Sequence, residues 1–209
     1  TTSEPTPDHD TFLLIHSDAA DGNQDFTDSS QFNRTVSINS SNVQHDTAIA
    51  KSGFGASSIL FDGTGDYLSV PDSPEWKVEG DFTWDAWIRP AAIGSKMSIF
   101  AQQNYGACSG INFYMQFEAS GKIEFSVCHN AGSGVGGQST TSLSAGTWYH
   151  VAVIKIGDIG GNGGSLMIAI NGTIETTATG NMDGSDMPDA VTIGHTGDSA
   201  VGDFNGHMD

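Results

Sequence analysis

Aspartate is the residue type in this sequence with the greatest capacity for chemistry, and it is concentrated in turns. Residues 16–28, HSDAADGNQDFTD, contain four aspartates, of which Asp18 is the first. A second acidic turn, FDGTGDY, contains Asp62 and Asp66, and the sequence ends on Asp209. Calcium is held by about six to eight oxygen atoms, which the carboxylates and backbone carbonyls of such turns can supply. The pattern therefore favours calcium as a ligand, with a solvated acidic surface as the alternative.

Cys108 and Cys128 flank two candidate strands, INFYMQF and KIEFSVC, which the tetrapeptide EASG joins. A hairpin with its turn at 118–121 would bring the two cysteines to nearly the same level at its open end. A disulfide there would close a loop of about 20 residues and contribute on the order of 3 kcal/mol in the chain-entropy model. The alternative is a pair of free thiols in a reducing compartment. No second Cys or His pair accompanies them to make a zinc pattern.

The segment DFTWDAWIRP, residues 81–90, differs between its two faces if it is a strand. One face would carry Phe82, Trp84, Ala86 and Ile88, and the other Thr83, Asp85, Trp87 and Arg89. We expect the first face in the core, together with Trp148 of the later segment TWYHVAVIK. The second face is typical of a strand that lines a partly covered concave surface. Trp87 is there a candidate for stacking on a sugar ring, with ordinary aromatic packing as the alternative.

The elements that would position these residues are short runs with apolar residues at alternate positions, closed by Gly, Asp, Asn or Pro. Such runs predict β-strands. They cover residues 11–18, 35–39, 57–63, 66–70, 82–90, 97–102, 111–117, 122–128, 148–156, 165–172, 173–178 and 190–195. Residues 129–140, HNAGSGVGGQST, are expected to form a long loop. No segment keeps a helical apolar period over three turns, so the sequence predicts an all-β, two-layer antiparallel sandwich with less than about a tenth of its residues in helix.

Length and charge narrow the possibilities further. A chain of 209 residues is long enough for one sandwich domain, which we place at 11–209, after a Thr- and Pro-rich linker or arm at 1–10. The formal net charge is −18, and a field of that sign repels phosphate backbones and anionic lipid. We therefore do not expect the protein to bind nucleic acid or membrane surfaces. No apolar run is long enough to span a bilayer, and the polar start TTSEPTPDHD is no signal peptide.

Five segments, in order, resemble the laminin G-like jelly roll of the concanavalin A-like lectin and glucanase superfamily. They are TFLLIHSDAADGNQDFTDSS, GASSILFDGTGDYLSVPDS, DFTWDAWIRP, TWYHVAVIK and FNGHMD. The resemblance covers residues 11–209 and implies a two-sheet antiparallel jelly roll. Similar domains bind a structural calcium ion, and the resemblance implies Asp18 and Asp209 as carboxylate ligands and Gly63 and Asp66 as backbone carbonyl ligands. It also implies a packing and hydrogen-bonding role for His150.

The sequence departs from the resembling pattern at its end. Similar domains continue past the position of Asp209 with a final strand that lies beside the first, so residues 11–18 are expected to present an open sheet edge. The chain is then either a fragment or the recipient of a strand from another chain, which would include assembly as a homo-oligomer.

The superfamily includes glucanases and polysaccharide lyases, so catalytic residues have to be considered. A retaining glycosidase of this fold carries Glu-x-Asp-x-x-Glu or a close variant on one strand, with the carboxyl groups about 5 Å apart. The nearest match, EASGKIE, puts Glu118 and Glu124 on different strands. Motifs for serine hydrolases, phosphate loops and zinc proteases are also missing from the sequence. We therefore expect no enzymatic activity.

Two classes of function are left. The first is a calcium-stabilised extracellular module that recognises a glycan or a surface protein, on a secreted protein, a cell surface or a virion. The second is a structural decoration or assembly subunit of a filament or virion. Binding predicts an exposed aromatic side chain beside polar groups in a groove. Assembly predicts large apolar contacts between chains and no groove.

Overall fold

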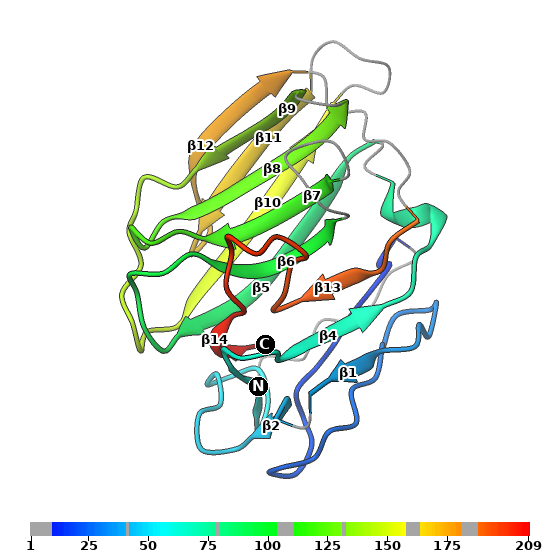
Figure 1. Cartoon of the computed structure of the whole chain (residues 1–209), viewed down its shortest axis with the longest axis vertical. Coiled ribbons are helices and arrows are strands. Elements are labelled where there is room, and N and C mark those ends of the chain that lie inside the picture. Colours follow the sequence, from blue (N-terminus) through cyan, green and yellow to red (C-terminus); the bar gives the residue numbers. More distant parts are fainter. Residues whose placement is uncertain are drawn as a thin grey trace.

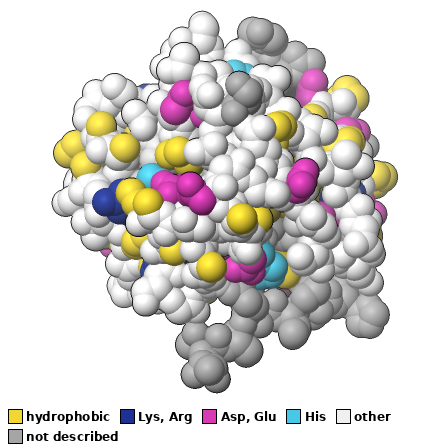
Figure 2. Space-filling model, turned by 90° about the horizontal axis from the view of Figure 1, so that it is seen from below, with side chains coloured by type: hydrophobic (Ala, Val, Ile, Leu, Met, Phe, Trp, Pro, Cys, Tyr) yellow, Lys and Arg dark blue, Asp and Glu magenta, His cyan; other side chains and the backbone are white. Residues whose placement is uncertain are grey.

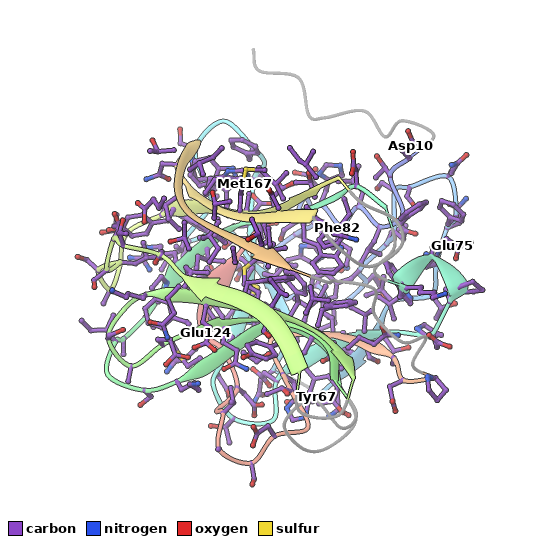
Figure 3. All side chains as sticks on the ribbon, turned by 90° about the horizontal axis from the view of Figure 1, so that it is seen from above. Asp10, Tyr67, Glu75, Phe82, Glu124 and Met167 are labelled. Carbon is purple, nitrogen blue, oxygen red and sulfur yellow. The ribbon has the colours of Figure 1, made fainter. Side chains whose placement is uncertain are left out.

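The computed structural model describes residues 10–40, 42–77, 80–103, 111–130, 133–157, 164–180 and 188–209. These residues form two antiparallel sheets of seven strands each (Figure 1). Figure 3 shows them as two stacked layers, with Met167 in one and Glu124 in the other. The predicted fold class, a two-sheet antiparallel jelly roll, is confirmed.

The first sheet, sheet I, has the order β1-β4-β13-β6-β7-β8-β9. Its strands are β1 (Ser37–Asn39), β4 (Tyr67–Val70), β13 (Val191–Ile193), β6 (Met97–Gln103), β7 (Ile111–Phe117), β8 (Ile123–Asn130) and β9 (Ser133–Gln138). The second, sheet II, has the order β12-β11-β10-β5-β14-β3-β2. Its strands are β12 (Thr173–Gly180), β11 (Gly164–Ile170), β10 (Tyr149–Ile156), β5 (Phe82–Pro90), β14 (Asn205–Met208), β3 (Ser58–Asp62) and β2 (Gln44–Asp46).

Helix is confined, within the described residues, to one turn of 3-10 helix at Pro74–Trp76. The low helix content expected from the sequence is therefore confirmed. In the same part of the chain, no helix has the length and apolar character needed to cross a membrane.

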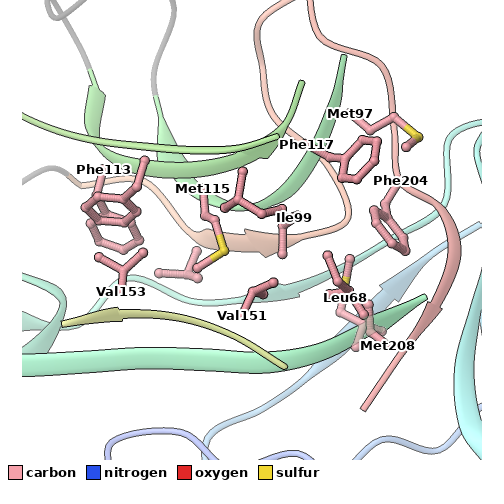
Figure 4. Packing of buried hydrophobic residues seen from close by; sticks show 14 of the residues in the cluster. Leu68, Met97, Ile99, Phe113, Met115, Phe117, Val151, Val153, Phe204 and Met208 are labelled. Atoms are coloured by element: carbon pink, nitrogen blue, oxygen red, sulfur yellow. The ribbon is translucent and has the colours of Figure 1, made fainter. Parts of the chain in front are cut away.

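The core lies between the sheets because the long central strands turn apolar side chains toward one another. Figure 4 shows Phe113, Met115 and Ile99 of sheet I facing Val151 and Val153 of sheet II, and all five side chains are buried. Burying one such side chain stabilises the fold by about 1.5–3 kcal/mol.

The predicted faces of β5 are confirmed. Ile88 is fully buried, and Phe82, Trp84 and Ala86 pack against the core although they are only half-buried. Trp84 lies with its ring centroid 4.0 Å from that of Phe113.

The expectation that Trp148 lies in the core is wrong. The inward face of β10 carries Val151 and Val153, which stand opposite Ala86 and Trp84 of β5. Because the side chains of a strand alternate between faces, Trp148 falls on the other side, where it is half-buried and outside the core cluster.

Residues 11–18 were expected to form a strand, and this is also wrong. The segment makes one isolated bridge, between Ile15 and Asp28. The Asp28 carboxylate accepts the backbone N–H of Leu14 at 3.0 Å, and the N–H of Ser29 donates to the Leu14 carbonyl at 2.7 Å. A side chain of the following turn therefore takes the place of a sheet ladder.

The sequence patterns did not predict strands β9 and β2. The stretch 129–140, expected to be a loop, contains β9, which pairs with β8. Gly136 permits this pairing because a Cβ at that position would collide with the Phe125 carbonyl oxygen. The short polar strand β2 was also not predicted, because its residues do not alternate between apolar and polar. Residues 1–9, most of the predicted arm, lie outside the described residues.

Candidate functional site

A groove of about 610 Å³ lies beside the end of the chain. Its lining comes from strands β5 and β10, from residues 208–209, from residues 13–16 and from Phe54. Most of its lining is apolar, and Asp85, His150 and Asn171 supply polar groups. An apolar groove with a few placed polar groups is the usual form of a ligand site.

Trp87 reaches this groove because of its place in the register of sheet II. It stands directly opposite His150 of β10. On its other side, its N–H donates to the Asp209 carbonyl at 2.7 Å and its carbonyl accepts the Asp209 N–H at 2.9 Å. Its ring centroid is 5.3 Å from the ring of Phe54 and 5.3 Å from the ring of His150. These three rings form what we call the aromatic cluster.

The polar groups of the groove are held by hydrogen bonds. His150 Nε2 lies 3.1 Å from Asp85 Oδ1, and the Asp85 side chain is 52% exposed. The His150 N–H donates to Asn171 Oδ1 at 2.9 Å, and the Asn171 N–H donates to the His150 carbonyl at 2.8 Å. A carboxylate, an imidazole and an amide therefore lie beside the aromatic cluster in fixed positions.

The groove also runs along a sheet edge. Strand β14 pairs with β5 only from Ile88 to Pro90, and the Trp87 hydrogen bonds to Asp209 extend this by one residue. Within the described residues, the earlier part of β5 has a backbone partner only in β10. Because residues 11–18 form no strand, the open sheet edge expected there is not present.

The residues predicted to bind calcium each have a defined environment in the structure. Asp18 lies beside Gly55, and Gly63 has φ +85° and packs beside the side chain of Asn205. Asp66 is fully buried, and its Oδ2 accepts the Asp62 N–H at 2.8 Å. Its Oδ1 has no hydrogen-bond partner in the part of the chain that is described.

The described residues contain no group of three or more His, Cys, Asp or Glu side chains placed to hold one metal ion. The expected ligand set takes carboxylates only from Asp18 and Asp209, with backbone carbonyls from Gly63 and Asp66, so the lack of such a group does not bear on it. What the structure does bring together is Asp209 and Trp87, which the sequence assigned to separate sites. Calcium binding itself stays a prediction.

The disulfide also stays a prediction. The β7–β8 hairpin is present with Phe117 opposite Ile123 and its turn closed by a hydrogen bond from Gly121 N–H to the Glu118 carbonyl. Cys108 lies outside the described residues, and the structure describes only the backbone of Cys128.

Sequence reasoning missed Phe54 and Lys51. Both lie in the loop between β2 and β3, and the Lys51 Nζ is 4.0 Å from the ring centroid of Trp87 and 5.1 Å from that of Phe54. A phenylalanine between two glycines, in KSGFGAS, has no strand period to explain it. The isolated Phe54 was therefore the one feature of the sequence that could have indicated this part of the groove.

A second polar cluster lies at the turn of the β7–β8 hairpin. Lys96 Nζ is 2.7 Å from Glu118 Oε1, and the Tyr114 hydroxyl donates to Glu124 Oε1 at 2.8 Å. Burial raises the pKa of Glu118, whereas for Glu124 burial is outweighed by hydrogen bonds from Glu118, Gln138 and Tyr114, which lower its pKa.

Lys96 links the two carboxylates of this cluster, since its Nζ also lies 3.9 Å from Glu124 Oε2. The Gln138 side-chain amide donates to the same oxygen at 3.0 Å. Both carboxylates are therefore engaged by side chains of the hairpin and its neighbours.

Comparisons with known proteins agree with this fold. The family model described as the concanavalin A-like lectin/glucanases superfamily, Laminin_G_3, matches residues 62–209. A search of curated protein sequences finds no significant match.

Similar solved structures include a ligand-binding domain of botulinum neurotoxin serotype D in complex with N-acetylneuraminic acid. It is 14% identical with a TM-score of 0.60, over 94% of this chain and 44% of that chain. Domains LG4-5 of the mouse laminin alpha1 chain are 16% identical with a TM-score of 0.53, over 72% and 39% of the two chains.

The enzymatically active domain of tailspike protein 2 from bacteriophage CBA120 is also similar. It is 14% identical with a TM-score of 0.50, over 84% of this chain and 27% of that chain. This chain thus spans less than half the length of each of the three structures, and identities this low show the fold alone. Since the family model matches well over half of the sequence, the chain belongs to the Laminin_G_3 family of the concanavalin A-like lectin and glucanase superfamily.

Proposed function

We propose that the protein is a non-catalytic recognition module that binds a glycan in the groove beside Trp87. It would act outside the cell, on a secreted protein, a cell surface or a virion. The observation that carries this proposal is the position of Trp87, half-buried in a groove with Asp85, His150 and Asn171. An aromatic ring beside polar groups in a groove is the arrangement that separates binding from assembly as the primary role.

The groove suits a saccharide chemically. The apolar face of a sugar ring can stack on an indole. Its hydroxyl groups can donate to the Asp85 carboxylate and exchange hydrogen bonds with the Asn171 amide. The complex of the similar toxin domain with N-acetylneuraminic acid supports a saccharide as the class of ligand. The positions of Glu118 and Glu124 on either side of a turn, instead of on one strand, support binding without hydrolysis.

The test is a panel of oligosaccharides screened by calorimetry with the wild-type protein, Trp87→Ala and Trp148→Ala. Trp148 is the matched control because it is also a half-buried tryptophan but does not line the groove. We expect Trp87→Ala to weaken binding roughly 5- to 30-fold, as truncation of a central aromatic residue does. Trp148→Ala should keep the wild-type affinity. Equal losses in both variants, or release of new reducing ends from a bound oligosaccharide, would contradict the proposal.

The unpaired stretch of β5 favours a second candidate, assembly by strand addition from another chain. An exposed strand edge offers backbone donors and acceptors to an incoming strand. Light scattering across a range of protein concentrations tests this candidate. A dimer that dissociates on dilution and excludes saccharide from the groove would favour assembly over glycan binding.

A further inference from the structure

The protein places one of its few cations on the aromatic cluster. It has only seven Lys and Arg residues, and the Lys51 Nζ lies 4.0 Å from the Trp87 centroid and 5.1 Å from the Phe54 centroid. The same ammonium donates to the Ser52 carbonyl at 3.2 Å. A cation within about 6 Å of a ring centroid is attracted by the negative face of the ring. The aromatic cluster therefore already holds an ammonium group, supplied by the loop between β2 and β3.

The charges around this position also favour a cation. Asp85 lies on the wall with its carboxylate 52% exposed, and Asp209 lines the same groove. One face of the molecule (Figure 2) shows acidic side chains at several places with hydrophobic ones among them. With a net charge of −18, the field of the protein concentrates cations at its surface and repels anions.

Resting on the proposed function, we propose that the groove selects glycans that carry ammonium groups. A protonated amino sugar binds over Trp87 and Phe54 in the place of the Lys51 ammonium, with its charge beside the Asp85 carboxylate. The sugar ring supplies the apolar face for Trp87, and the ammonium group supplies the cation that Lys51 now provides. Glycans with carboxylate groups, such as uronates, are disfavoured by Asp85 and by the net charge.

The test uses two saccharides with the same backbone, one carrying charged amines and the other neutral acetamides. One is the hexamer of β-1,4-linked glucosamine, at a pH at which its amino groups are protonated, and the other is its fully N-acetylated counterpart. We expect the amine to bind roughly 3- to 30-fold more tightly, the combined effect of one exposed cation–π contact and one exposed ion pair. A hexamer of a uronic acid should bind more weakly than either.

Three variants test which side chains cause the preference for the amine. Asp85→Asn should reduce the preference for the amine about two- to fivefold. Asp198→Asn, which removes the same charge from a loop that does not line the groove, should leave the preference unchanged. Lys51→Met should strengthen amine binding about two- to fivefold, because the competing ammonium is gone. Melting temperatures of all variants establish that they are folded.

The possible outcomes separate this inference from the proposed function. If the two hexamers bind with equal affinity and Trp87→Ala loses binding of both, the amine preference is overturned and glycan binding in the groove is kept. Amine binding that is unaffected by Trp87→Ala, Asp85→Asn and Lys51→Met shows general attraction to an acidic surface and overturns the inference. If no saccharide binds, including those of the wider panel, both the amine preference and the proposed function are overturned.

Discussion

Removing the Asp28 carboxylate should destabilise the protein strongly, because several buried donors lose their acceptor. Asp28 is 1% exposed and accepts four hydrogen bonds. Three come from the backbone N–H groups of Leu14 (3.0 Å), Ser30 (2.9 Å) and Arg34 (2.8 Å) and one from the Ser30 hydroxyl (2.8 Å). Each buried donor left without an acceptor costs about 1–3 kcal/mol. Because Leu14 and Arg34 are only partly buried and can regain water, we expect Asp28→Ala to cost about 3–5 kcal/mol in total.

Thermal and urea unfolding measure this loss. For a domain of this size it corresponds to a fall in melting temperature of roughly 6–20 °C. Limited proteolysis should cut residues 11–18 faster in the variant, since this segment is tied to the turn by Asp28. Asp28→Asn keeps one oxygen acceptor and should lose less. A loss below about 1 kcal/mol for Asp28→Ala, with residues 11–18 still protected, would refute the assignment of Asp28 as the anchor of this segment.

The same site predicts a pH dependence. Burial raises the pKa of Asp28, but the N–H groups of Arg34, Leu14 and Ser30 together lower it below its ordinary value of 3.8. Because the folded-state pKa is below the unfolded one, the stabilisation is fully present above the unfolded pKa. It is lost as pH falls through the folded pKa, so the window lies below about pH 4. Asp28→Asn should lack this component of the acid sensitivity when stability is measured against pH.

Three other predictions concern the core, the cysteines and calcium. Trp84→Ala should cost about 3–5 kcal/mol in urea unfolding, whereas Trp148→Ala should cost far less, since Trp148 lies outside the core cluster; similar losses would mean that β10 is inverted. Thiol titration of the unfolded, unreduced protein should find no free thiol, and two titratable thiols would exclude a bridge between Cys108 and Cys128. If calcium binds, a chelator should lower the melting temperature, and Asp18→Asn should remove most of that response, because Asp18 is expected to supply a carboxylate ligand. An unchanged response in Asp18→Asn would exclude Asp18 from the ligand set.

The sandwich could be predicted because its strands are specified locally. The alternation of Phe82, Trp84, Ala86 and Ile88 with polar residues identifies both the strand and its inward face. A period of two has no other common explanation over nine residues. The hairpin of β7 and β8 was predictable for the same reason, since two alternating runs flank a short turn.

The errors arise where the controlling interaction lies outside the segment. Residues 11–18 carry strand-like apolar residues, but their backbone partner is the side chain of Asp28, which no local pattern reveals. Strand β9 is rich in glycine, which ordinarily weakens a strand. There the absence of a Cβ at Gly136 is what allows close approach to β8. In both cases tertiary contacts override the local preference.

The groove contains residues placed by a local pattern and residues placed by tertiary contacts. Trp87 was therefore identified from the sequence, whereas its neighbours were not. The outward position of Trp87 follows from the period of β5 alone. The positions of Phe54 and Lys51 depend on how the loop between β2 and β3 folds over the outer face of sheet II, and His150 and Asp209 are set by the register of two other strands. Holding the Lys51 ammonium over the half-buried Trp87 ring costs side-chain entropy of up to about 2 kcal/mol. The cation–π contact offsets part of that cost, which favours exchange of Lys51 for an ammonium group of a ligand. An incoming ammonium group then meets aromatic rings and a carboxylate that the fold already holds in position.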